Sequence, residues 1–161
     1  MIRNSRMHIV AGIILLGVVF SACEKELTRF VKSKFDNGQP KMILYYNGER
    51  AEENFVKMET YYENGQIKSI INFDGADKDG IMRSWHPNGQ PLSKAEYVKD
   101  KKEGYTFYNH RNGQTKYEGN YLHNRKDGKW VAYNKEGDTL RVETYEKGKL
   151  VDLKNYKTNT K

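Results

Sequence analysis

Apolar and polar positions alternate in short segments across residues 35–156 of this 161-residue chain. The segments run for about seven to nine residues, are rich in tyrosine, valine, isoleucine and threonine, and are separated by polar turns that contain glycine. No apolar period near 3.6 residues is sustained between these glycines. The pattern therefore predicts β-strands throughout this region and disfavours helices.

The turns recur with a fixed period. The tripeptide Asn-Gly-Gln appears three times at intervals of 24 residues, an earlier copy precedes the first of these by 27 residues, and a Glu-Gly-Asp variant follows the last by 24. The turn glycines of the five copies are Gly38, Gly65, Gly89, Gly113 and Gly137. Fixed self-similarity of this kind is the signature of a repeat architecture.

Each copy also carries an aromatic residue eight positions after its glycine. These repeat core aromatics are Tyr46, Phe73, Tyr97, Tyr121 and Tyr145. A second glycine follows the first by 15 residues in the three central copies, at Gly80, Gly104 and Gly128. Because equal phase in the repeat means equal height on a sheet, the aromatic residues are expected to align and to form the core.

The two punctuation points predict two kinds of turn. Asn-Gly tolerates the positive φ angles of a type I′ turn, so it predicts a tight hairpin. The second point is a charged tract ending in glycine, such as residues 100–104, and predicts a longer turn at the opposite end of the strands. Each repeat is then one β-hairpin, and about five repeats of 24 residues form an all-β antiparallel meander of roughly ten strands, about 45 to 50 Å long.

The repeat also resembles a known family. Residues 128–133, Gly-Lys-Trp-Val-Ala-Tyr, with the Asn-Gly-Gln turns and a later tyrosine before a charged glycine turn, are similar to the MORN repeat variant, which occurs in bacterial antitoxin components of the YwqK family. The resemblance covers about residues 35–156 and is best between Tyr61 and Tyr145. It implies a single-sheet hairpin array that binds other proteins or, in some members, membranes, with no catalytic centre and no cofactor.

The first 23 residues predict export. Arg3 and Arg6 precede an apolar run from Ile9 to Phe20, which is shorter than the roughly 20 residues of a membrane-spanning helix. Residues 19–23, Val-Phe-Ser-Ala-Cys, resemble the bacterial lipobox, although Phe20 stands where leucine is usual. We expect a lipoprotein signal peptide at 1–22, lipidation of Cys23, a tether at 23–34, the repeat domain at 35–156 and a polar tail at 157–161.

Charge and cysteine content narrow the classes of partner. Two of the 28 basic residues and none of the 21 acidic residues precede Cys23, so the remainder has a net charge of +5. Cys23 is the only cysteine in the sequence, which excludes an intrachain disulfide bond. Because Glu24 follows it, where aspartate marks inner-membrane retention in some bacteria, we expect a lipid-anchored protein of the cell envelope, probable site the outer membrane.

Catalytic and metal sites find little support in the sequence. His86 and His110 share a repeat position but have no third ligand in register, so no metal site is expected. The aligned carboxylates Asp79, Glu103 and Asp127 precede glycines, and turn chemistry explains them. No serine lies in a nucleophile-elbow pattern and no phosphate-binding glycine loop precedes a helix. We expect no enzyme activity, no cofactor and no small-molecule substrate.

Three functions remain open. Alternating lysine and aromatic residues, as in Lys129-Trp130, could hold single-stranded nucleic acid, but strand alternation produces them without that role, so no nucleic acid is expected. The first hypothesis is a scaffold that binds a protein partner or envelope components, with Trp85, Trp130 and Tyr133 as possible anchors beside a reading as core residues. An antitoxin or immunity-type inhibitor of a toxin and a binder of envelope glycan or lipid surfaces are the alternatives.

Overall fold

The computed structural model describes residues 26–157 as one twelve-stranded antiparallel sheet. The strands are β1 (Thr28–Lys34), β2 (Pro40–Tyr46), β3 (Phe55–Tyr61), β4 (Ile67–Asp74), β5 (Asp77–Lys78), β6 (Gly80–Trp85), β7 (Pro91–Val98), β8 (Lys101–Asn109), β9 (Thr115–Leu122), β10 (Arg125–Tyr133), β11 (Thr139–Glu146) and β12 (Lys149–Asn155). The predicted all-β meander of hairpins is confirmed, with twelve strands where about ten were expected.

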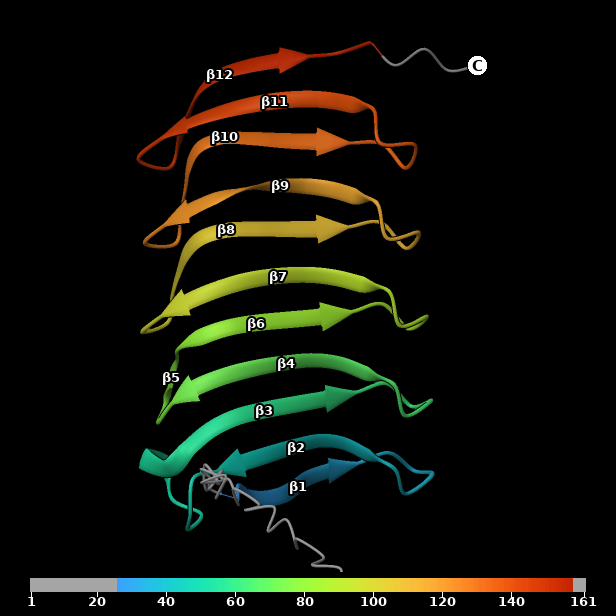
Figure 1. The fold of residues 1–161 in the computed structure, drawn as a ribbon, viewed down its shortest axis with the longest axis vertical. Helices are drawn as coiled ribbons and strands as arrows, with labels where there is room; N and C mark the ends of the chain where they lie inside the picture. Colours follow the sequence, from blue (N-terminus) through green and yellow to red (C-terminus); the bar gives the residue numbers. More distant parts are fainter. Residues whose placement is uncertain (1–25, 158–161) are drawn as a thin grey trace, which may run out of the picture.

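Each strand pairs with the next one along the chain, except that the two-residue β5 pairs only with β4. The strands therefore follow one another from β1 at one end of the sheet to β12 at the other, in a single layer with two open edges (Figure 1). The Asn-Gly-Gln loops lie along one side of this layer, and the connections that follow β2, β4, β7, β9 and β11 lie along the opposite side. We call these the Asn-Gly side and the charged-turn side.

The Asn-Gly loops differ from the predicted type I′ turn. Gly65 has φ +80°, whereas Asn64 is absent from the residues with positive φ in the described part of the chain. The N–H of Gly65 donates to the carbonyl of Tyr62 at 2.9 Å, and the N–H of Tyr62 donates to the carbonyl of Gln66 at 2.8 Å. This is a three-residue loop with a type I turn followed by a glycine bulge. The Asn64 Oδ1 atom stabilises it by accepting from the N–H of Gln66 at 3.1 Å.

The type I′ geometry occurs on the charged-turn side instead. Lys99 and Asp100 have φ of 46° and 63°, and His123 and Asn124 have φ of 51° and 66°. The glycines predicted to end longer turns there lie in strands: Gly80 begins β6, Gly104 lies within β8 and Gly128 lies within β10. That prediction was wrong because a glycine with positive φ also suits a β-bulge, which shifts the register and increases the twist of the strand.

Two predicted boundaries also change. Strand β1 starts at Thr28, inside the segment 23–34 that was predicted to be a tether, and pairs with β2 through the whole of its length. The longer first interval of 27 residues is accommodated between β2 and β3, where a one-turn 3₁₀ helix, Glu52–Asn54, lengthens the connection. Lys157 is the last described residue, so the rest of the predicted polar tail and the predicted signal peptide with Cys23 lie outside the described residues.

Because the sheet is one layer, its core is a set of side chains on the sheet surface. The buried apolar residues are Ile43, Ile71, Ala95, Trp130 and Ala132. Within residues 26–157, no helix has the length and apolar character needed to cross a bilayer.

Candidate functional site

The register of the strands divides the side chains between two faces. Trp130 pairs with Glu143 across β10 and β11, and Ala132 pairs with Tyr117 across β10 and β9, so these four residues point to the same side, which we call the Trp130 face. Glu118 neighbours Tyr117 in β9 and points to the opposite side, the Glu118 face. The centre of the Trp130 face is a row formed by Leu44, Met58, Ile71, Met82, Ala95, Thr106, Gly119, Trp130 and Glu143.

Trp130 is the packing centre of this row. Its relative exposure is 0 %, and its ring centroid lies 4.8 Å from that of Tyr117 and 5.0 Å from that of Tyr121. The indole N–H donates to the carbonyl of Asn120 at 3.0 Å. The possible role of Trp130 as an exposed binding anchor is therefore wrong, because its whole surface is used inside the sheet. The other two candidate anchors, Trp85 and Tyr133, are half-buried.

The five repeat aromatics all lie half-buried on the Trp130 face, towards the charged-turn side. In the three later copies each ring faces a lysine from the preceding strand. The Nζ atoms of Lys78, Lys102 and Lys126 lie 5.5, 5.0 and 4.5 Å from the centroids of Tyr97, Tyr121 and Tyr145, respectively. We call this series the lysine–tyrosine column. Its cation–π contacts link consecutive hairpins of the array.

The column ends in a buried ion cluster around Glu143, which is 7 % exposed. Its Oε2 atom accepts from the hydroxyls of Tyr117 and Tyr145 and lies 3.4 Å from Lys126 Nζ, while Oε1 lies 2.7 Å from Arg141 Nε. Burial alone would raise the pKa of Glu143, but the two tyrosine hydroxyls and the two cations lower it. Burial and the bond to Glu143 raise the pKa of Tyr117 to about 12. Glu143 is therefore held as a carboxylate that bonds on every side.

The same arrangement of two tyrosine hydroxyls on one glutamate occurs twice on the Glu118 face. Tyr105 and Tyr133 both donate to Glu118, and Tyr45 and Tyr61 both donate to Glu59. Burial and the bond to Glu118 raise the pKa values of Tyr105 and Tyr133 to about 12. These hydroxyls stay protonated at neutral pH and tie neighbouring strands together.

A hollow opens on the Trp130 face beside the Asn-Gly side. Its volume is about 790 Å³, within the range of ligand-binding clefts. Ala132 has a small side chain and sits between Tyr117 and Arg141 on the flanking strands, which leaves room above it. The lining combines the rings of Tyr108 and Tyr117 and the side chains of Leu92 and Leu140 with three cations, Lys116, Lys135 and Arg141, and one acid, Glu136.

Comparison with known proteins places this repeat in a family. The MORN repeat variant matches residues 56–74 and 78–99. The chain carries MORN repeat variants. No curated protein matches the chain. The first matched segment covers β3 and β4, and the second covers β6 and β7, so each MORN repeat variant is one hairpin closed by an Asn-Gly-Gln loop. The later hairpins, β8–β9 and β10–β11, repeat this structure with the same register of glycines.

On the Asn-Gly side, neighbouring MORN repeats are joined by hydrogen bonds. His86 Nε2 lies 3.2 Å from the carbonyl of Asn109, and His110 Nε2 lies 3.1 Å from the carbonyl of Tyr133, so each ring nitrogen donates to the following repeat. The loop asparagines form a parallel series in which each side-chain amide donates to a carbonyl of the next loop: Asn37 to Glu63, Asn64 to Pro87, Asn88 to Arg111 and Asn112 to Lys135. The aligned histidines thus have a role in joining repeats.

On the charged-turn side, the aligned carboxylates cap the turn of the next repeat. Asp79 Oδ2 accepts from the N–H of Lys99 at 3.3 Å, and Glu103 Oε1 accepts from the N–H of His123 at 3.0 Å. The interpretation as turn chemistry holds for these two residues, although the turn that each one serves belongs to its neighbour. In the described part of the chain, no group of three or more histidine, cysteine, aspartate or glutamate residues could hold a metal ion.

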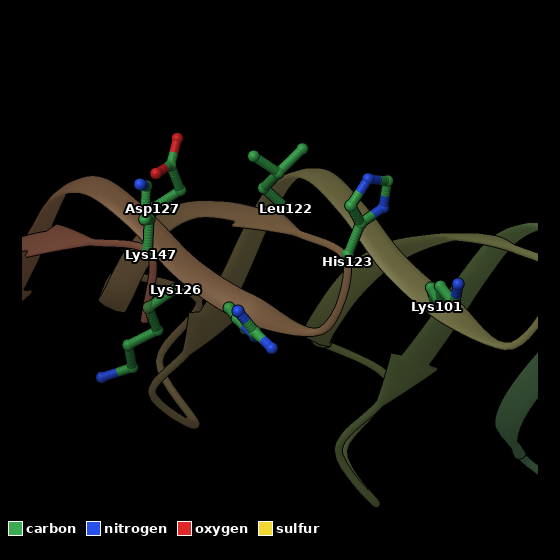
Figure 2. A pocket seen from close by; sticks show the side chains of 7 residues that line it. Lys101, Leu122, His123, Lys126, Asp127 and Lys147 are labelled. Carbon is green, nitrogen blue, oxygen red and sulfur yellow. The ribbon is translucent and has the colours of Figure 1, made fainter. Parts of the chain in front are cut away.

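A smaller recess of about 360 Å³ lies on the charged-turn side between β8, β10 and the β11–β12 turn. Figure 2 shows Leu122, His123 and Asp127 pointing to one side of the sheet and Lys126 to the other, so the labelled side chains do not converge on one point. Asp127 is the third of the aligned carboxylates and lines this recess. The recess is basic, but Lys126 is already engaged by the cluster around Glu143.

Sequence reasoning missed the lysine–tyrosine column and the hollow. The column had a usable signal, because Lys78, Lys102 and Lys126 each stand two residues before a repeated glycine and share the period of 24. The hollow had none, since it depends on alanine replacing tyrosine at one equivalent position: Ala132 occupies the place that Tyr108 has one repeat earlier.

Proposed function

We propose that this protein is a non-catalytic scaffold of the cell envelope, anchored by lipid at Cys23, which binds a protein partner on its Trp130 face. The observation that supports this function best is the hollow above Ala132. It offers two aromatic rings and aliphatic side chains next to three cations, the mixture that anchors partners at protein interfaces.

The orientation of Arg141 favours binding at this place. Its Nε atom is held 2.7 Å from the buried carboxylate of Glu143, while half of its side chain is exposed. The guanidinium is therefore fixed on one side and keeps donors for a partner on the other. A preorganised arginine loses less freedom on binding and suits carboxylate groups.

The titratable groups of the array support a non-catalytic role. Glu59, Glu118 and Glu143 each accept hydrogen bonds from two tyrosines, and bonded carboxylates of this kind are poor general bases because their charge is already stabilised. Their raised tyrosine pKa values likewise disfavour proton transfer near neutral pH.

The start of the sheet agrees with an anchor at Cys23. Strand β1 begins at Thr28, five residues later, so a lipid on the cysteine would hold the array close to the membrane surface. The repeat array would then extend from this point through all twelve strands. The placement in the envelope, with the outer membrane as the favoured leaflet carrier, comes from the export signal and from Glu24 and is part of the proposal.

The test is affinity capture from a cell-envelope extract on the full chain at low and high salt, with bound proteins and glycans identified. The variant Arg141→Gln changes the hollow, and Arg83→Gln is the matched control because Arg83 is exposed and pairs with Ile70 on the Glu118 face. We expect one protein that stays bound at high salt and is lost with Arg141→Gln alone.

The other outcomes decide between the alternatives. Capture of a toxin that the chain inhibits would identify an immunity-type inhibitor. Capture of lipid or acidic polymer that salt removes would identify a general envelope binder, since such attraction is screened. Equal capture by wild type and both variants would overturn the assignment of the hollow as the binding site.

A further inference from the structure

The free edge of β12 combines apolar side chains with unpaired backbone. Every residue from Lys149 to Asn155 is exposed, and Leu150, Val151 and Leu153 have relative exposures of 50 %, 53 % and 48 %. Natural sheets usually blunt such edges with charges, prolines or very short strands. In β12 the lysines stand at Lys149 and Lys154, and the middle of the strand between them is largely apolar.

The backbone of β12 is oriented for a further strand. The N–H of Tyr156 donates to the carbonyl of Leu140 at 2.9 Å, so residues in step with Tyr156 direct their backbone groups towards β11. Because the direction alternates along an antiparallel strand, Leu153 and Asn155 direct their N–H and C=O groups to the open edge. Leu153 also lies on the Trp130 face, opposite Glu143.

We propose that two copies of this chain associate by antiparallel pairing of β12 with β12 about a two-fold axis at Leu153. In this register Leu153 faces its own copy, and Asp152 of each copy faces Lys154 of the other. Asp152 and Lys154 point to the same face because they pair with Thr144 and Val142. Both charge pairs are therefore complementary, and the pairing continues the antiparallel order of the meander across the axis.

The charges of the other edge exclude the alternative pairings. Strand β1 carries Arg29, Lys32 and Lys34 and no acidic residue, so two β1 edges repel each other. A β1 edge against β12 would also bring these three cations near Lys149 and Lys154, with Asp152 as the only acid. Among the edge pairings that the sheet permits, β12 with β12 alone matches opposite charges. A single strand edge is a small interface, so we expect a reversible dimer.

The experiment uses disulfide trapping in the full chain. Leu153→Cys places two thiols across the axis, where Cα atoms of a hydrogen-bonded antiparallel pair are about 5.5 Å apart, within the range that a disulfide spans. The matched control is Val98→Cys, since Val98 is equally exposed at 48 % but lies at the end of β7. The wild type, which has only Cys23, gives the background. We expect a strong disulfide-linked dimer for Leu153→Cys only.

Charge reversal tests the register. In the Leu153→Cys chain, Asp152→Lys faces two lysines against each other and should lower the dimer yield several-fold. Adding Lys154→Asp restores opposite charges and should restore the yield. Trapping no greater than that of Val98→Cys, failure of the double exchange to restore it, or trapping of Leu153→Cys only to a different protein would each overturn the proposal. None of these results bears on the hollow, so the proposed binding function stands or falls separately.

Discussion

Gly119 lies directly beneath the indole of Trp130, and a β-carbon at position 119 would come within 2.2 Å of the Trp130 Cδ2 atom. Gly119 → Ala therefore cannot be accommodated unless the indole moves. Trp130 is fully buried, packed between Tyr117 and Tyr121 and bonded through its N–H, so it has no free direction to move in. We expect Gly119→Ala to lower the free energy of unfolding by about 2 to 3 kcal/mol, measured by urea denaturation.

Two comparison variants separate this clash from a general loss of glycine. Asn120→Ala changes an exposed side chain in the same strand and should alter the stability by less than about 0.5 kcal/mol. In a Trp130→Val background the clash is removed, so Gly119→Ala should cost much less than it does in the wild type. Equal costs in the two backgrounds would show that Trp130 is not the cause.

Glu143 makes the stability of the sheet depend on acid. The folded-state pKa of Glu143 is lowered from 4.5, so its contribution to stability is complete above pH 4.5 and is lost as the pH falls through the lower folded-state pKa. We expect the free energy of unfolding to fall below about pH 4.5 in the wild type. Denaturant titrations between pH 7 and pH 3 measure this. The Glu143→Gln variant should be less stable at pH 7 and should show a smaller loss in acid, and parallel pH profiles for the two proteins would contradict the role of Glu143.

Lys126 and Lys78 occupy equivalent positions in the lysine–tyrosine column but differ in their partners. Lys126 Nζ lies 3.0 Å from the Tyr145 hydroxyl and 3.4 Å from Glu143 and also bonds Tyr117, whereas Lys78 contacts only the Tyr97 ring within the column. Replacing Lys126 by methionine leaves Glu143 with one fewer cation. We expect a cost of about 2 kcal/mol for Lys126→Met and of about 0.5 kcal/mol for Lys78→Met. Equal costs in thermal or urea unfolding would indicate that only the cation–π contact contributes.

Lipidation predicts a visible difference in processing. If Cys23 carries the lipid, Cys23→Ala stops both cleavage of residues 1–22 and incorporation of labelled fatty acid. The measurement is the gel mobility and the fatty-acid label of the protein from cells that produce each form. Cys23→Ser is a matched variant that keeps a small polar side chain and should also lose the label. Labelling of the alanine variant at the wild-type level would remove the lipoprotein from the proposed function.

The hairpin repeat was predictable from the sequence because its signals are local. The glycines and the five aromatics recur at a fixed interval, and each turn needs only its own residues. The face on which a side chain lies was also predictable within one strand. The tyrosine–glutamate clusters were not, because Tyr117 and Glu143 lie on strands that are not adjacent, and their contact depends on the register of three strands together.

The turn types were the part of the fold that sequence reasoning assigned to the wrong ends. Asn-Gly favours a type I′ turn when only two residues close the hairpin. Here the bond from the Gly65 N–H to Tyr62 makes the loop one residue longer, and Asn64 serves it through its side chain instead of through a positive φ. Lysine and histidine at Lys99 and His123 gave no local signal for the type I′ turns that they occupy, since the turn is imposed by bonds to the preceding repeat.

That assignment of turn types leads to a stabilising substitution. Lys147 has φ 50° and is followed by Gly148 with φ 83°, in the two-residue turn between β11 and β12. A left-handed backbone costs a lysine about 1 kcal/mol, whereas asparagine tolerates it and forms the Asn-Gly dipeptide that two-residue type I′ turns prefer. We expect Lys147→Asn to raise the free energy of unfolding by about 0.5 to 1 kcal/mol in urea denaturation. Lys135→Asn, at an exposed position with ordinary φ in an Asn-Gly-side loop, is the control and should have little effect. Equal stabilisation by both substitutions would show that the gain does not come from the left-handed backbone at Lys147.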